Sequence, residues 1–462
     1  MADDHSEKVI DALRDNLRGR VVGPRDADWD TQRRAWHLLA DQRPAAVVHV
    51  TDADDIAAAI RIAAVHGLPV MAQPVGHGAT PAADGTILLR TGALDGIEID
   101  SERRVARVEA GVRWRDLNAA LAETGLMSLP GSSGDTSVVG YTLGGGLSWF
   151  GRKHGYAAHH VLAAELVTAD GDLVRVTRES DPDLFWALRG GGGDFGIVVA
   201  LDLNLLPADG MYGGRLMWPI EHARDVLRVF ADVTSTAPDD LSLWAWLLNL
   251  PDLPFVPEVA RGHWLVAVDV VFLGSADDAE EFVRPLRAVA APWADSLAAM
   301  PAHAVGTISQ EPDDPLPGML RSVLLEEFGA AAQDALLDVA APGSASPMGA
   351  YEVRHLGGAL ARRHGQDGSA GHVDEPYLLL FGGLAPTPEL AEVVTKSIEA
   401  TLAAMSPWTS DRALPNFSSG EESRRFHSAE TLTRLRRIKN RIDPRGTIRG
   451  NHPVARAEPF GA

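Results

Sequence analysis

Apolar positions between residue 44 and about residue 207 repeat with the short periods of strands and helices in alternation. The stretch from Val47 to Gly67 predicts a strand, an Asx or Thr helix cap, an alanine-rich helix and a glycine stop. A second apolar strand, Leu68 to Ala72, leads into a tight turn. Further strands are predicted at 105–112, at 160–169 and 172–176 as a hairpin, and at 197–206, and a helix at 115–123.

The pattern changes after Pro207. Three longer apolar runs with helical segments between them predict an antiparallel sheet covered by helices, from about residue 208 to residue 410. The strands are expected at 241–250, 263–272 and 377–383, and the helices at 276–289 and 389–405. Near the end of the chain, apolar residues three or four positions apart predict an amphipathic helix: Leu432, Leu435, Ile438 and Ile442.

The composition argues against a membrane-spanning, secreted or disulfide-bonded protein. Hydrophobic residues make up 45% of the 462 positions, and no run of about 18 apolar residues occurs, so no membrane span is expected. The first ten residues lack the basic and apolar regions of a signal peptide, which favours a cytoplasmic location. The sequence has no cysteine, which excludes disulfides, thiolate ligands and cysteine nucleophiles. No metal site is predicted.

The formal charge of −21 argues against a nucleic-acid partner. Nucleic-acid binding requires a basic patch, and the only basic cluster of note is Arg434–Arg449. Its apolar spacing is that of an amphipathic helix, so we interpret the charges as a solvated helix face. We therefore expect no nucleic-acid partner.

The turn after Ala72 places His77 between Gly76 and Gly78. A backbone with so few Cβ atoms can bring its N–H groups against a phosphate, and the lone imidazole can then bond to a cofactor. The alternative is a turn histidine with no partner. Residues 47–80 alone leave both interpretations open.

Four other segments favour the first interpretation. They are Gly140–Gly155, with the run Gly144–Gly146; Asp181–Val198, with the run Gly190–Gly193; Tyr351–Gly358; and Arg434–Pro444, followed by Asn451–Val454. In this order and spacing the chain resembles the berberine-bridge-enzyme-like FAD-linked oxidases of the vanillyl-alcohol-oxidase type, in their bacterial branch similar to 6-hydroxy-D-nicotine oxidase. The resemblance covers roughly residues 20 to 456.

The resemblance implies an α+β fold in three parts. Residues 1–207 would form a PCMH-type FAD-binding domain of two subdomains. Residues 208–410 would form the substrate-binding domain, an antiparallel sheet covered by helices. Residues 411–462 would return to the FAD-binding domain.

It also implies FAD attached covalently through His77 only. In the family, this histidine bonds the 8α-methyl group of FAD, and the backbone around it wraps the pyrophosphate. The cofactor-binding residues at the turn would be Gln73, Pro74, Val75, Gly76, Gly78 and Ala79. This chain departs from the family pattern at the turn and at the position of a second flavin bond. The family often has an arginine where this chain has Gln73, and Pro74 donates no N–H. The cysteine of bicovalent relatives falls at Ser133, so a second bond is impossible.

Other cofactor contacts follow from the same resemblance. Thr136 aligns with a position lining the oxygen pocket near flavin N5, although a loop threonine that caps its own turn is the alternative. Four glycines would let the chain pass close to the cofactor: Gly140, Gly144, Gly145 and Gly146. Ile197 and Val198 resemble the strand that reads adenine, and Asn451 resembles the asparagine beside the flavin ring.

The residue that would take a proton from the substrate does not follow directly from the family pattern. The tyrosine that family members use would fall at Leu414, two residues before Asn416. The remaining catalytic candidates are Glu352 and Tyr141. Glu352 shares a strand face with Arg354, so it is either a base of raised pKa or one half of a structural ion pair. Trp246 and Trp264 are substrate-wall candidates, or core.

The resemblance thus implies an FAD-dependent oxidase of secondary metabolism. It would take a hydride from a C–H of an aromatic or polycyclic alcohol or amine and pass electrons to O2. One alternative is a flavin-containing binding or resistance protein, favoured by the missing tyrosine. Another is a dehydrogenase with a different acceptor. A homodimer is a candidate assembly.

Overall fold

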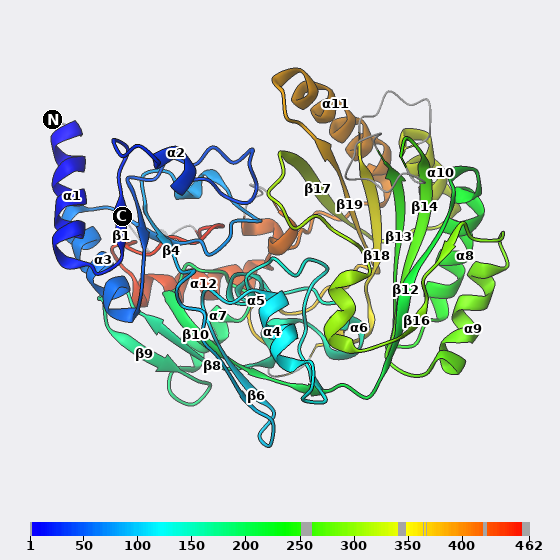
Figure 1. Ribbon diagram of the computed structural model, residues 1–462, viewed down its shortest axis with the longest axis horizontal. Helices are drawn as coiled ribbons and strands as arrows, with labels where there is room; N and C mark the ends of the chain where they lie inside the picture. Colours follow the sequence, from blue (N-terminus) through cyan, green and yellow to red (C-terminus); the bar gives the residue numbers. More distant parts are fainter. Residues whose placement is uncertain are drawn as a thin grey trace.

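The computed structural model describes residues 2–250, 261–340, 348–363, 365, 367–418 and 423–454. It has the predicted α+β class, with small sheets in the first half of the chain and one large sheet in the second (Figure 1). Among the described residues, no helix is long and apolar enough to cross a membrane.

A four-stranded sheet carries the turn that contains His77. Its strands lie in the order β1 (Arg20–Val22), β2 (Ala46–His49), β4 (Ile87–Arg90) and β3 (Val70–Ala72), and β4 runs parallel to both β2 and β3. Helix α3 (Ala53–His66) joins β2 to β3. The Asp52 side chain accepts the Asp55 amide at its start, and Gly67, at φ 68°, ends it in the left-handed conformation. The predicted cap, helix and glycine stop are confirmed.

A five-stranded antiparallel sheet follows. Its order is β5 (Ile97–Asp100), β6 (Val105–Glu109), β10 (Ile197–Asn204), β8 (Val161–Val167) and β9 (Leu173–Val176), and a two-stranded sheet pairs β7 (Leu126–Met127) with β11 (Leu206–Pro207). The helices of this half are α1 (Ala2–Asn16), α2 (Trp29–Gln32), α4 (Trp114–Leu121), α5 (Val138–Leu143), α6 (Gly151–His154) and α7 (Pro182–Leu188). Strand β6 ends before the predicted position 112, because the Gly111 amide turns to the Leu94 carbonyl.

The large sheet is antiparallel throughout. Its main order is β15 (Ala294–Asp295), β12 (Met211–Pro219), β14 (Trp264–Phe272), β13 (Leu241–Asn249), β18 (Ala350–His355), β19 (Tyr377–Leu384) and β17 (Gly318–Leu325), and β16 (Ala298–Met300) pairs with β12. Helices α8 (Ala223–Thr236), α9 (Ala276–Arg287), α10 (Ala330–Ala340) and α11 (Pro388–Met405) complete this half, and α8, α9 and α10 cover its outer side in Figure 1.

Alternation along the strands divides the residues of this sheet between two faces. On β13, Leu243, Ala245 and Leu247 belong to the core under the helices. The intervening residues Trp244 and Trp246 face the other way. This second face holds the ionic groups described below.

Two large apolar cores result. One joins residues of α1 through β10 with Leu432, Leu435 and Ile438 of α12 (Ala429–Ile442). The other lies between the large sheet and its helices. In Figure 1 the C-terminal segment correspondingly lies among the elements of the first half of the chain.

Candidate functional site

The turn at His77 is held by the rest of the first sheet. Arg90, at the end of β4, donates to the Gln73 side chain at 2.8 Å. The Trp36 and His37 amides donate to the carbonyls of Val75 and Gly76. Arg90 is buried, and burial lowers its pKa to about 10. The sequence suggested that this turn lacks a basic residue; the structure supplies one from the next strand.

The His77 side chain is confined, and within the described part of the chain its Nε2 atom has no hydrogen-bond partner. Its side chain is 21% exposed, while its Nε2 atom is buried without a hydrogen-bond partner and lies 3.6 Å from Asp135 Oδ2. The Trp36 indole stacks on the imidazole at 4.0 Å between ring centroids. Burial lowers the pKa of His77 to about 4, so the ring is neutral at physiological pH. A neutral imidazole has one ring nitrogen without a proton, and the lone pair of that nitrogen can form a bond to a cofactor.

The C-terminal segment reaches the same turn. Asn451 donates its amide to the Gly78 carbonyl at 2.5 Å and accepts from the Thr80 hydroxyl at 3.0 Å. The Asp194 carboxylate accepts the backbone amides of Gly450 and Val454 at 2.8 and 2.9 Å. The two predicted residues His77 and Asn451, 374 positions apart, are therefore brought together.

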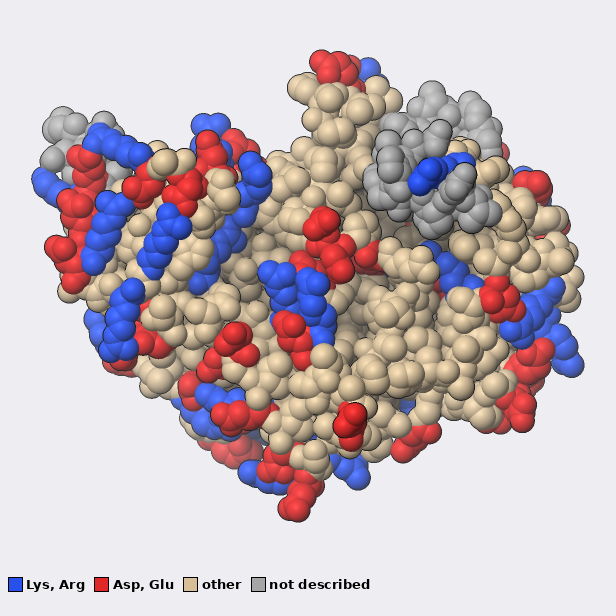
Figure 2. Space-filling model, viewed as in Figure 1, with Lys and Arg blue, Asp and Glu red and all other residues tan. Residues whose placement is uncertain are grey.

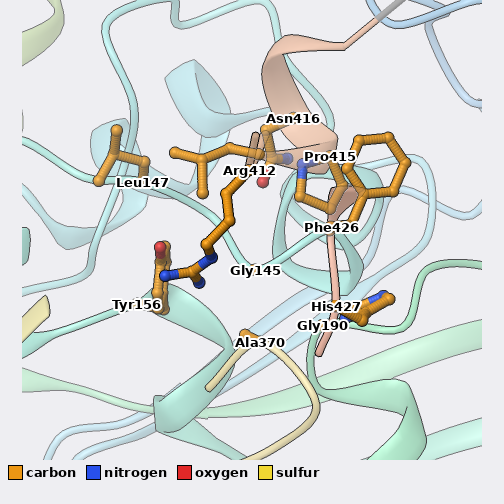
Figure 3. Close-up of a pocket in the computed structure, with 12 residues that line it drawn as sticks. Gly145, Leu147, Tyr156, Gly190, Ala370, Arg412, Pro415, Asn416, Phe426 and His427 are labelled. Atoms are coloured by element: carbon orange, nitrogen blue, oxygen red, sulfur yellow. The ribbon is translucent and has the colours of Figure 1, made fainter. Parts of the chain in front are cut away.

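The predicted glycines Gly144 and Gly145 line a pocket. Asn416 fixes this segment, because its side chain accepts the Gly146 amide and donates to the Tyr141 carbonyl, both at 3.0 Å. The other walls include Tyr156, Gly190, Arg412 and His427, and Figure 3 shows Arg412 extending toward Tyr156. Sequence reasoning missed Arg412 and His427, which lie in the stretch of chain just before α12.

The face of the large sheet turned away from its helices carries Glu352 and Arg354 on β18. Arg354 donates to both carboxylate oxygens of Glu352, at 2.8 and 3.0 Å. Both residues are buried, and the guanidinium lies 3.9 Å from the centre of the Trp244 ring. Burial raises the pKa of Glu352 to about 7 in spite of Arg354, from a usual value of 4.5.

A second buried ion pair, which the sequence did not reveal, lies on the same face. Arg215 on β12 donates to both oxygens of Asp269 on β14, at 2.5 and 2.7 Å. The Trp246 indole donates to Asp269 at 2.8 Å, and the Ser309 hydroxyl at 3.0 Å. Arg215 and Asp269 are single polar residues in long apolar strands, and the sequence alone does not show that they pair. Only the register of the strands places them side by side.

The two halves of the molecule meet between these groups. Arg354 donates to the Ser132 hydroxyl at 3.2 Å, three residues before Asp135. Glu311 lies 3.7 Å from the Arg354 guanidinium and acts electrostatically on both His77 and Glu352. Glu311 is therefore a charged group that influences both the His77 imidazole and the Glu352 carboxylate.

This chain is similar to known FAD-dependent proteins. A family model described as an FAD binding domain matches residues 44–177. The (R)-6-hydroxynicotine oxidase of Paenarthrobacter nicotinovorans is 27% identical over 459 residues, covering 95% of this chain and 97% of that protein. The FAD-dependent monooxygenase tpcD of Cochliobolus heterostrophus is 36% identical over 212 residues. Here the match covers 44% of this chain and spans only 41% of the relative's length.

Solved structures give the same result. The crystal structure of 6-hydroxy-D-nicotine oxidase from Arthrobacter nicotinovorans matches with a TM-score of 0.81 at 25% identity, covering 95% of this chain and 98% of that one. This chain is a relative of the berberine-bridge-enzyme-like FAD oxidases. Berberine bridge enzyme from Eschscholzia californica shares the fold, with a TM-score of 0.83 at 19% identity over 98% of this chain and 100% of that one. The predicted FAD binding domain and the predicted relationship to 6-hydroxy-D-nicotine oxidase and the berberine-bridge-enzyme-like FAD oxidases are confirmed.

The turn of this flavoprotein fits the cofactor. A buried imidazole nitrogen without a hydrogen-bond partner lies beside Gly78, where an added Cβ would meet only the Asn451 amide, at 3.7 Å. Gly76 adopts φ 97° and approaches Ala35 so closely that a Cβ would lie 2.9 Å from it. The backbone there is thus shaped for close approach, as phosphate-binding turns are. Among the described residues, no group of three or more His, Asp or Glu side chains is arranged to hold a metal.

The structure argues against two of the residues expected to act on substrate in this flavoprotein. The Tyr141 hydroxyl is buried and donates to the Leu129 carbonyl at 3.1 Å, and burial raises its pKa well above its usual value, so it is a poor base. Trp264 alternates with Leu265 and shares the face of Val266 and Val268 under the helices. It therefore lies on the face opposite to Trp246 and Glu352.

Four further predicted positions have ordinary local roles. Thr136 accepts the Trp114 amide with its backbone carbonyl, and Gly140 is exposed on α5. Ile197 and Val198 are buried at the start of β10, paired with β8. Their expected contacts with the oxygen pocket and with adenine stay predictions.

Proposed function

We propose that this flavoprotein is an oxidase whose FAD is bonded to His77 alone. The supporting observation is the buried, neutral and unpaired imidazole of His77 at the turn of the FAD binding domain. Attachment would replace one N–H hydrogen of the imidazole and one C–H hydrogen of the 8α-methyl group with an N–C bond. O2 would be the acceptor of the two electrons and two protons, giving hydrogen peroxide. Ser133, in place of a cysteine, permits no second bond.

The residues of the turn then have distinct tasks. The backbone of Gln73–Ala79, with Arg90 behind it, would hold the pyrophosphate, and Asn451 would lie beside the flavin ring. The glycines Gly144–Gly146 would keep the chain close to the cofactor. FAD supplies the chemistry of accepting a hydride from the substrate.

Glu352 is the proposed base. When the substrate gives up a hydride from its C–H, the hydroxyl or amine on that carbon must lose a proton, and the Glu352 carboxylate takes it. A pKa near 7 suits this task, because the group is then both available and able to release the proton. Arg354 holds the carboxylate with two hydrogen bonds, and Trp246 forms an aromatic wall on the same face. The proposed substrate is an aromatic or polycyclic alcohol or amine of secondary metabolism.

One experiment tests the attachment. Acid-precipitated protein should stay yellow, and His77→Ala should release the colour into the supernatant. A colourless wild-type pellet would contradict the proposal. His37→Ala is a suitable control, since His37 is the neighbouring histidine, and its ring contacts the Gly318 carbonyl instead.

A second experiment separates the oxidase from its alternatives. Protein reduced under anaerobic conditions should be reoxidised rapidly on mixing with air, with stoichiometric hydrogen peroxide. Slow reoxidation would favour a dehydrogenase. Tight binding of aromatic compounds without any flavin reduction would favour a binding or resistance protein.

The architecture we propose assigns residues 1–207 and 411–462 to the FAD-binding unit and 208–410 to the substrate-binding unit. The membership of the two apolar cores supports this division. A cytoplasmic location in a bacterial cell and a homodimer stay predictions.

A further inference from the structure

Asp135 is a buried acidic residue beside His77. The residue is 2% exposed, and its two carboxylate oxygens face different partners. Oδ1 accepts hydrogen bonds from both Arg113 and Arg115, at the start of α4. Oδ2 lies 3.6 Å from Nε2 of His77. This buried carboxylate therefore has one oxygen fully engaged and the other directed at the imidazole.

The imidazole is held in a plane that makes this contact directional. Trp36 stacks on it with an angle of 18° between the rings, and the Trp36 indole is itself anchored by a 3.1 Å hydrogen bond to the Asp313 carbonyl. The gap of 3.6 Å is longer than a hydrogen bond, and closing it requires a movement of only about 0.6 Å. No other hydrogen-bond acceptor contacts this buried Nε2 atom among the described residues.

A neutral imidazole carries its one N–H on either nitrogen, and a neighbouring acceptor decides which. An N–H on Nε2 points at the Asp135 carboxylate, whereas a lone pair on Nε2 would face its negative charge. Asp135 therefore favours the form with the proton on Nε2 and the lone pair on Nδ1.

We propose that Asp135 is a positioning residue that keeps the proton of His77 on Nε2 and so makes Nδ1 the nitrogen that bonds FAD. The inference rests on the attachment proposed above. When the N–C bond forms at Nδ1, the ring becomes cationic until it loses the proton on Nε2, and Asp135 is the adjacent group that stabilises this charge until that proton leaves.

The first test identifies the bonding nitrogen in the wild-type holoprotein. Protein grown with ¹⁵N-labelled histidine is digested, the flavin peptide is isolated, and NMR assigns the nitrogen joined to the 8α carbon. We expect Nδ1. Attachment through Nε2 would overturn the inference without touching the proposed function, and this test requires no variant to fold.

The second test is Asp135→Asn. Its amide can donate to Nε2 and so permits the other imidazole form. We expect FAD to bind but to attach at least about tenfold more slowly, the usual effect of removing a group that orients a reacting histidine. The readout is the fraction of flavin that survives acid precipitation, followed over time after adding FAD in air. Asp135→Glu should restore part of the rate.

Asp313→Asn is the matched control, because its carboxylate also lies near Arg115, at 3.9 Å, whereas the carboxylate beside His77 is that of Asp135. It should attach FAD at the wild-type rate. An Asp135→Asn variant that also attaches FAD at that rate would overturn the inference. If wild-type protein holds no acid-stable flavin at all, the proposed attachment fails first and this inference fails with it.

Discussion

Glu352 is subject to opposing effects that decide its protonation state. Two hydrogen bonds from Arg354 favour the carboxylate, while complete burial favours the neutral acid, and burial has the larger effect on its pKa. Glu311 and Asp269 add negative charge nearby. The residue is therefore half ionised near neutral pH, which an ordinary structural ion pair would not be.

The first prediction concerns the rate of flavin reduction. Because the base acts only when ionised, the rate should rise with pH through about 7 and level off above it. Glu352→Gln should remove this pH dependence and lower the rate about a hundredfold or more, with FAD loading unchanged. Stopped-flow reduction measures both effects. Glu327→Gln, on the exposed surface, is the control, and a variant that reduces flavin normally would exclude the catalytic role.

The second prediction concerns stability. The pKa of Glu352 is about 7 in the folded protein, above its usual 4.5. The folded state thus binds a proton that the unfolded state has lost. Stability from this residue is complete below about 4.5 and is lost as the pH rises to about 7. Relative to Glu352→Gln, the wild type should lose about 3 kcal/mol across this window. Denaturant melts at pH 4.5 and 8 measure it, and a constant difference between the proteins would contradict it.

At the residue scale, sequence reasoning succeeded where chemistry follows from local spacing. Period-two alternation placed Glu352 and Arg354 on one face, and the structure pairs them. It failed for Asp135, Trp36 and Arg90, because their contacts with the His77 turn come from other strands and loops. No local pattern distinguishes such residues from other loop or strand residues.

At the scale of elements, Lys439 shows how a helix pattern can mislead. The basic residues of α12 were interpreted as a solvated face, and Arg434 and Arg441 do pair with Asp183 and Asp181 at the surface. Lys439, however, is buried and donates to Asp443 and to the carbonyls of Asp194 and Ile448. The amphipathic pattern located the helix correctly, but a single cation bonded inside the fold could not be told from its solvated neighbours.

The third prediction tests how the C-terminal segment is held. Asp194→Asn keeps one acceptor oxygen and loses the other, so one of the Gly450 and Val454 amides becomes unsatisfied. We expect a loss of about 1–3 kcal/mol and faster proteolysis near residue 450. Thermal melting and limited digestion measure these. Asp183→Asn, which breaks only an exposed pair with Arg434, should change stability by less than about 0.5 kcal/mol.

The fourth prediction concerns the glycine run between α7 and β10. Gly190 adopts φ 119°, and a Cβ there would lie 2.1 Å from the Ala370 nitrogen. Gly190→Ala should therefore destabilise the protein by several kcal/mol, because backbone must move on both sides. Gly329→Ala, where a Cβ meets nothing within 4 Å, is the control and should melt like the wild type. Equal melting temperatures for both variants would show that the segment relaxes freely.

Over the whole molecule, charges of both signs are spread among neutral residues on the face shown in Figure 2. Apolar packing joins the two halves in addition to the hydrogen bonds between them. The core of the first half takes in Trp244, Val271 and Ile308 from the second. The Trp149 and Trp244 rings stack across this junction at 3.2 Å between centroids. The sequence indicated two units, but which residues join them depends on tertiary placement.

The last prediction follows from this shared core. Since each unit buries residues of the other, wild-type protein should unfold in a single calorimetric transition. Trp149→Ala removes a fully buried ring from the junction, at a cost of about 3–5 kcal/mol, and the transition should broaden or split as the units lose their coupling. Trp293→Ala is the control, because this ring is 42% exposed on the second unit. A Trp149→Ala protein that still melts in one sharp transition would show that the units are coupled by contacts other than this ring pair. The interactions of Arg152 with the Leu241 and Leu356 carbonyls would then be the next contacts to remove.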